Sequence, residues 1–143
     1  MKKVIKSLIW NAIIFIFTLL GLILYIANCN SIYFKKFGVN SKIIVFIVLA
    51  LVMEIVLLAI DFIKENKFKG ILSDAMSIII PIFVIAAIAY LLDARIYYAA
   101  TILTYEKTNQ NVQDLLPALV SLGSLLISFI LSIVFSFIAK KDN

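Results

Sequence analysis

The chain has 143 residues, of which 64% are hydrophobic and 15% are charged, and its formal net charge at pH 7 is +5. A soluble domain is about 45–50% apolar and about 25% charged, so a water-soluble fold of this length could not bury so much apolar surface. The lysines cluster at the ends of apolar segments, which is typical of contact with lipid headgroups and not with nucleic acid. We therefore expect an all-α, polytopic membrane protein that contacts the lipid bilayer and binds no nucleic acid.

The residue inventory also excludes several classes of active site. The chain contains no histidine and one cysteine, Cys29. Histidine-dependent catalytic triads, zinc sites built from His and Cys, and an intramolecular disulfide are therefore excluded. No phosphate-binding glycine loop, nucleophile elbow or pair of carboxylates at catalytic spacing occurs either. We expect no enzyme, no metal site and no cofactor.

Four apolar segments predict four membrane-spanning helices, packed as an antiparallel bundle in a single transmembrane domain, 1–143. We expect the helices at about 8–27, 43–63, 74–92 and 114–139, and the third extends to about 104 if the apolar residues after Leu92 remain helical. At about 1.5 Å per residue these segments rise roughly 28–38 Å, enough for a hydrocarbon core of about 30 Å. Pro81 falls inside the third helix, and Pro117 is expected in the first turn of the fourth.

Lysine placement predicts the orientation of the bundle. With the N-terminus inside, eight Lys and Arg residues fall in the inner segments and five in the outer ones. The positive-inside rule therefore places both termini in the cytoplasm. The abundance of isoleucine, lysine and asparagine favours a bacterial source, so we expect a multi-pass protein of the plasma (inner) membrane.

Glu54 lies near the middle of the second apolar segment. A carboxylate at membrane depth is energetically costly and indicates a functional site by default. Thr18 and Ser128 lie near the midpoints of the first and fourth segments, so their hydroxyls are expected at the level of Glu54 if these faces turn inward. Without a lysine or arginine at that depth, we expect Glu54 to be mostly uncharged at neutral pH. Three roles stay open: a buried structural hydrogen bond, a proton, cation or substrate site, and a contact between subunits.

Asp61 lies two turns beyond Glu54 on roughly the same face, near the cytoplasmic end of the second segment. We include it in the intramembrane polar site. The alternative interpretation is an interfacial charge that pairs with Lys64, one turn away.

The fourth segment carries serines at spacings of 3, 4, 4 and 4, which places them along one helical ridge: Ser121, Ser124, Ser128, Ser132 and Ser136. Small hydroxylated ridges let helix backbones approach closely, so we predict a helix-packing face. Its partner is either another helix of this chain or another subunit. In the alternative interpretation, each serine only bonds to the carbonyl four residues earlier in its own helix.

The outer segment after the third helix begins with Asp93, Arg95, Tyr97 and Tyr98. These residues predict either an interfacial aromatic belt or an external recognition patch that meets a partner or a solute. Two hypotheses for the whole chain follow. In the first, it is a non-enzymatic accessory subunit of a larger membrane assembly such as a transporter, since the short loops leave little mass for chemistry in water. In the second, it is a homo-oligomeric transporter or channel that uses Glu54.

Overall fold

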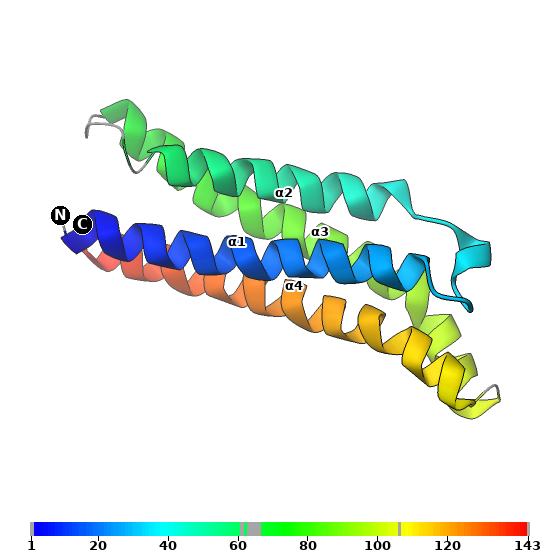
Figure 1. Ribbon diagram of the computed structural model, residues 1–143. Coiled ribbons are helices and arrows are strands. Elements are labelled where there is room, and N and C mark those ends of the chain that lie inside the picture. The colour runs from blue at the N-terminus through cyan, green and yellow to red at the C-terminus, as the bar shows by residue number, and fades with distance from the viewer. Residues whose placement is uncertain (1, 61, 63–66, 106, 143) are drawn as a thin grey trace.

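The computed structural model describes residues 2–60, 62, 67–105 and 107–142. In this part of the chain four helices run up and down: α1 (Lys2–Cys29), α2 (Ser41–Ile60), α3 (Lys67–Thr104) and α4 (Asn109–Asp142). A short 3-10 turn, η1 (Lys35–Phe37), lies in the connection between α1 and α2. Both ends of the chain lie at the same end of the bundle (Figure 1). We call this the terminal end and the opposite one the outer end.

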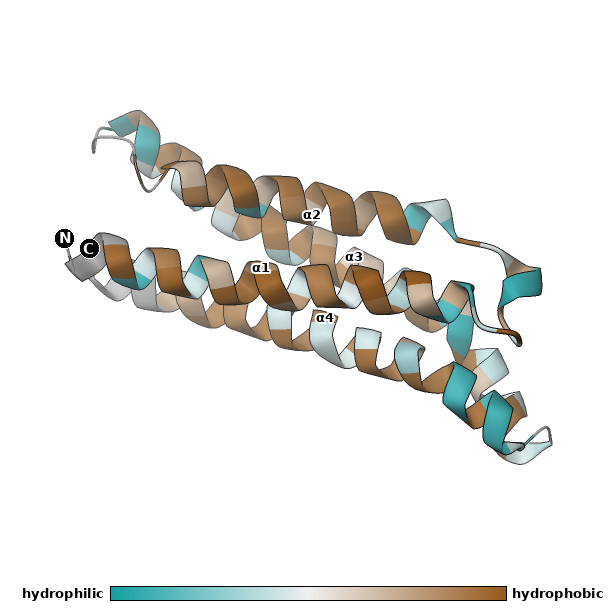
Figure 2. Cartoon of the chain, viewed as in Figure 1, coloured by the Kyte–Doolittle hydropathy of each residue, from teal (hydrophilic) through white to brown (hydrophobic). Residues whose placement is uncertain are grey.

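Each of the four helices contains a stretch that is long and apolar enough to cross a membrane. The prediction of an all-α protein with four such helices is therefore confirmed. Figure 2 shows hydrophobic residues along the middle of the helices and hydrophilic residues mainly toward their ends and connections. This distribution matches a bundle whose central zone is covered by lipid, because a helix satisfies its backbone hydrogen bonds internally and leaves only side chains to face the hydrocarbon.

The helices extend beyond most ends of the apolar segments that predict them. α3 starts at Lys67 and not near 74, and it continues through 93–104 to Thr104. α2 ends at Ile60, whereas the sequence suggests 63. Apolar composition marks the part of a helix suited to lipid, while helical hydrogen bonding continues into polar flanks until a cap or a turn ends it. The helices are therefore longer at most ends than the apolar segments that predict them.

Pro117 does not lie in the first turn of its helix, because α4 starts earlier than predicted, at Asn109. The start is fixed by Thr108, whose Oγ1 accepts a hydrogen bond from the backbone N–H of Asn111 at 3.1 Å. Pro117 therefore sits in the helix interior and leaves the carbonyl of Gln113 without a helical donor. Gln113 is exposed at the outer end of α4, where water can satisfy this carbonyl.

The helices form a ring in which α1 neighbours α2 and α4, and α3 neighbours the same two helices. The most extensive packing joins α1 to α4 and α2 to α3. The main core between them includes Tyr25, Ile47, Val84, Leu91 and Leu125, all fully buried. A second, smaller core at the outer end, which we call the outer cluster, consists of Phe34, Ile102 and Leu115. It joins the connection after α1 to the outer turns of α3 and α4.

Candidate functional site

The structure brings Glu54, Thr18 and Ser128 into contact at mid-depth of the bundle, and we call this group the central polar layer. Glu54 comes from α2 and is only 2% exposed. Thr18 Oγ1 on α1 lies 2.9 Å from Glu54 Oε1 and 2.5 Å from Ser128 Oγ on α4. One hydroxyl therefore connects three helices, at the level expected from the position of each residue within its apolar segment.

The two oxygens of the Glu54 carboxyl group have different surroundings. Oε1 contacts the Thr18 hydroxyl, which also donates to the backbone carbonyl of Ile14 at 2.9 Å. Oε2 is buried and has no hydrogen-bond partner among the described residues. An unsatisfied buried polar atom is uncommon in a folded protein and calls for a physical explanation.

The serine ridge meets α1 of the same chain. Ser121 Oγ donates to the backbone carbonyl of Gly21 on α1 at 2.6 Å, and Ser121, Ser124, Ser128 and Ser132 are all buried. Ser132 instead donates to the carbonyl of Ser128, four residues earlier in its own helix, at 2.8 Å. The ridge thus combines the two interpretations: Ser121 bonds to another helix, and Ser132 bonds within its own helix. Since α1 covers this face, the ridge is not available to another subunit.

Ser136, the last residue of the ridge, is half-buried near the terminal end of α4. Asp61 and Lys64 lie outside the described residues, so the proposed pairing of these two side chains stays a prediction.

The interpretation of Arg95 as part of an external patch is wrong, because its side chain is buried and only 5% exposed. Its Nε donates to Asn28 Oδ1 at 2.7 Å and its Nη2 contacts Cys29 Sγ at 3.4 Å, both on α1. The guanidinium carbon also lies 4.5 Å from the centroid of the Phe34 ring. Contact with an amide oxygen and an aromatic face offsets part of the cost of burying this charge.

The other residues of the predicted patch divide between two faces. Asp93 and Tyr97 are exposed, and Tyr97 is 71% exposed. Tyr98 is half-buried and packs its ring against Phe37, with 4.2 Å between the ring centroids. Of the four residues of the predicted patch, only Asp93 and Tyr97 therefore remain accessible to a partner.

Asn28 and Asp114 complete a second buried polar group with Arg95, which we call the outer polar layer. Asn28 Nδ2 donates to the backbone carbonyl of Asp114 at 2.8 Å, while its Oδ1 accepts from Arg95. The Asp114 carboxylate accepts the backbone N–H of Tyr33 at 3.0 Å and the side-chain amide of Gln110 at 2.8 Å. Asn28 shares a polar stripe of the first apolar segment with Thr18, but neither Asn28 nor Asp114 was predicted as a site residue, because each lies at the end of an apolar segment, where polar residues are common. The seven-residue spacing from Gly21 to Asn28 was the available signal for one face of α1.

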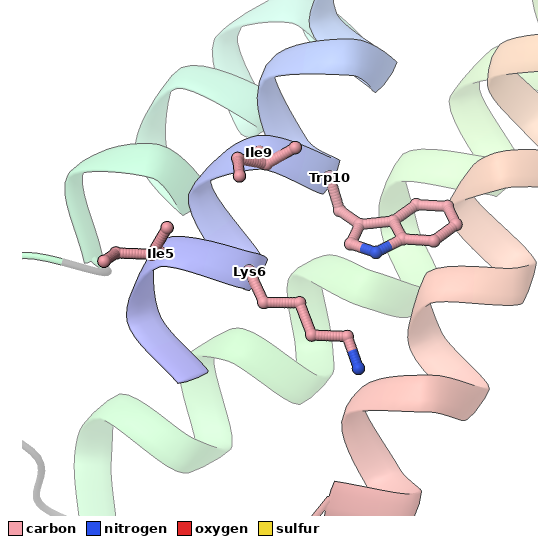
Figure 3. Close-up of a pocket in the computed structure, with 4 residues that line it drawn as sticks. All are labelled: Ile5, Lys6, Ile9 and Trp10. Atoms are coloured by element: carbon pink, nitrogen blue, oxygen red, sulfur yellow. The ribbon is translucent and has the colours of Figure 1, made fainter. Parts of the chain in front are cut away.

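Two further features bear on ligands. A surface hollow of about 270 Å³ near the terminal end is lined by Ile5, Lys6, Ile9 and Trp10 of α1 (Figure 3). None of these residues belongs to either polar layer. Within the described residues, no group of three or more His, Cys, Asp or Glu side chains could hold a metal ion.

Comparison of the chain with family models, curated proteins and solved structures finds no match.

Proposed function

We propose that this chain is a non-enzymatic accessory subunit of a larger membrane assembly, such as a transporter, in a bacterial plasma membrane with both termini in the cytoplasm. The observation that carries the proposal is a set of exposed apolar side chains on the outer turns of α3 and directly after its end. This outer surface consists of Ile96, Tyr97, Leu103 and Tyr105.

The spacing of the two polar layers supports a placement of the outer turns of α3 beyond the hydrocarbon. Thr18 and Asn28 are ten residues apart on α1, so the layers are separated by about 15 Å along the helix axis. That is half of a hydrocarbon core of about 30 Å. With the central polar layer at the midplane, Arg95 lies at the outer edge of the hydrocarbon, because it bonds to Asn28. The helical residues after Arg95 then rise roughly 13 Å further, through the headgroups and into water.

By this placement Ile96 and Tyr97 lie at the level of the headgroups, and Leu103 and Tyr105 lie beyond the lipid tails. Tyr97 and Tyr105 are 71% and 87% exposed, and Ile96 and Leu103 are 62% and 54% exposed. Apolar side chains that are exposed outside the hydrocarbon favour contact with another protein or with the membrane surface. Since α1 covers the serine ridge, we place the docking contact at the outer surface, which shares Tyr97 with the predicted external patch.

Site-specific photo-cross-linking tests this proposal. A photoreactive phenylalanine analogue at Tyr97 is expected to form a discrete adduct with a larger membrane protein in native membranes. The matched control is Ile85, which is exposed on the same helix within the hydrocarbon zone and is expected to meet lipid. Absence of any protein adduct at Tyr97 contradicts the proposal. An adduct of twice the chain mass of 16.1 kDa supports a homo-oligomer instead.

The second candidate function is a homo-oligomeric transporter or channel that uses Glu54. It is favoured by the buried Oε2 atom, which has no partner among the described residues. Ionisable groups inside a membrane often mark ion or proton pathways. The test is transport in proteoliposomes: Glu54→Gln abolishes uptake in this case, and it leaves the cross-link from Tyr97 unchanged.

A further inference from the structure

Glu54 is isolated from other charges along the whole membrane zone. In 7–34, 43–60, 75–92 and 115–139 it is the only Asp, Glu, Lys or Arg residue. The buried Arg95 belongs to the outer polar layer, about 15 Å away along the helix axis, and it bonds to Asn28 there. Among the described residues, a carboxylate in the central layer would therefore have no cation nearby to offset its charge, and Oε2 would have no donor.

The contacts of Thr18 show how many hydrogen atoms the central layer requires. Thr18 Oγ1 lies within hydrogen-bond distance of three oxygens: Ile14 O, Glu54 Oε1 and Ser128 Oγ. Each of these three contacts needs one hydrogen atom between its two oxygens. A backbone carbonyl supplies none, and the hydroxyls of Thr18 and Ser128 supply one each. A protonated carboxyl group of Glu54 supplies the third hydrogen, so that no two contacts have to share one.

One arrangement satisfies all three contacts. Ser128 donates to Thr18, Thr18 donates to the Ile14 carbonyl, and a protonated Glu54 donates from Oε1 to Thr18. The Thr18 hydroxyl then donates once and accepts twice, which is its full capacity. With an ionised Glu54, the single Thr18 hydrogen would have to be shared between Ile14 O and Glu54 Oε1, which weakens both contacts.

We infer that Glu54, Thr18 and Ser128 form a proton-binding site in the membrane core, in which the neutral carboxyl group of Glu54 donates to Thr18. The proton is the ligand that the hydrogen-bond contacts of Thr18 favour, and Oε2 has no hydrogen-bond partner among the described residues. The inference goes beyond the accessory role and holds whether or not the chain transports anything.

Isotope-edited infrared spectroscopy tests the inference on the full chain in lipid. The sequence has three glutamates, Glu54, Glu65 and Glu106, so ¹³C labelling of the glutamate side-chain carboxyl isolates three signals. At neutral pH we expect one carbonyl band of a protonated carboxylic acid in the labelled protein, and we expect Glu54→Gln to remove it. A spectrum with only carboxylate bands at neutral pH overturns the inference.

A second pair of variants keeps Glu54 in place and tests its hydrogen-bond partner. Thr18→Val removes the acceptor with little change in volume, so the carbonyl band of Glu54 is expected to shift. Thr18→Ser retains the hydroxyl and is the matched control, with the band unchanged. An identical band in the wild type, Thr18→Val and Thr18→Ser proteins refutes donation to Thr18. These spectra do not depend on the cross-linking result at Tyr97, so the two proposals can fail separately.

Discussion

The closest approach of α1 and α4 gives a sharp test of the packing, and Gly21→Ala is the perturbation. A Cβ atom added at Gly21 would lie 2.7 Å from Cγ and 2.8 Å from Cδ2 of Leu125. Leu125 is fully buried on α4, so its side chain has no free space to move into. The two helices therefore have to separate or Leu125 has to leave its preferred rotamer.

The expected cost combines three effects. Overpacking of a tight core costs about 1–3 kcal/mol. Separation of the helices also lengthens the bond from Ser121 Oγ to Gly21 O, and such a bond between membrane helices contributes about 0.6 kcal/mol. Alanine in place of glycine within a helix returns about 0.5–1 kcal/mol. We expect a net loss of about 0.6–3 kcal/mol in the free energy of unfolding.

The matched control is Gly123→Ala on α4. It makes the same chemical change within a helix, and a Cβ atom at Gly123 would meet nothing within 4 Å. Reversible unfolding of both variants in mixed micelles, with helix content as the readout, gives the two free energies. Gly123→Ala is expected to equal or exceed the wild type in stability. Equal stability of the two variants would show that α1 and α4 do not approach each other as described.

Two further predictions address the outer polar layer and the orientation. Asn28→Ala removes the acceptor of the buried Arg95 Nε, so we expect a loss of about 1.5–3 kcal/mol in the free energy of unfolding in the same assay. The control is Asn30→Ala, at an exposed position. Equal stability of the two variants contradicts the role given to Asn28. For orientation, a membrane-impermeant thiol reagent added to intact cells is expected to label Lys35→Cys and to spare Lys67→Cys until the membrane is permeabilised; the reverse pattern places the termini outside.

Much of the fold is predictable from sequence because the membrane simplifies the problem. A run of apolar residues long enough to cross the hydrocarbon can satisfy its backbone groups only as a helix or a closed barrel. The helix ends are less predictable, since Thr108 sets the start of α4 by a local cap that hydropathy does not detect. The position of Pro117 within the helix follows from that cap.

Depth was readable from the sequence, whereas the direction of each side chain was not. Thr18, Glu54 and Ser128 each lie near the middle of an apolar segment, and a fixed rise per residue places them at one level. Arg95 lies at a segment end, where a basic side chain normally extends to water or headgroups. Its burial depends on Asn28 and Phe34, which belong to other parts of the chain. Such partners become visible only when the packing of the helices is known.

The two polar layers connect two helix pairs of different character. α1 and α4 approach closely where Ser121 bonds to Gly21. α2 and α3 pack through apolar and aromatic side chains such as Phe46 and Tyr90, whose ring centroids are 5.5 Å apart. Glu54 links α2 to the α1–α4 pair at mid-depth, and Arg95 links α3 to the same pair at the outer edge. If the proposed proton leaves Glu54, the Thr18 hydroxyl has to turn from the Ile14 carbonyl toward Glu54. The link at Glu54 is therefore one that a proton can change.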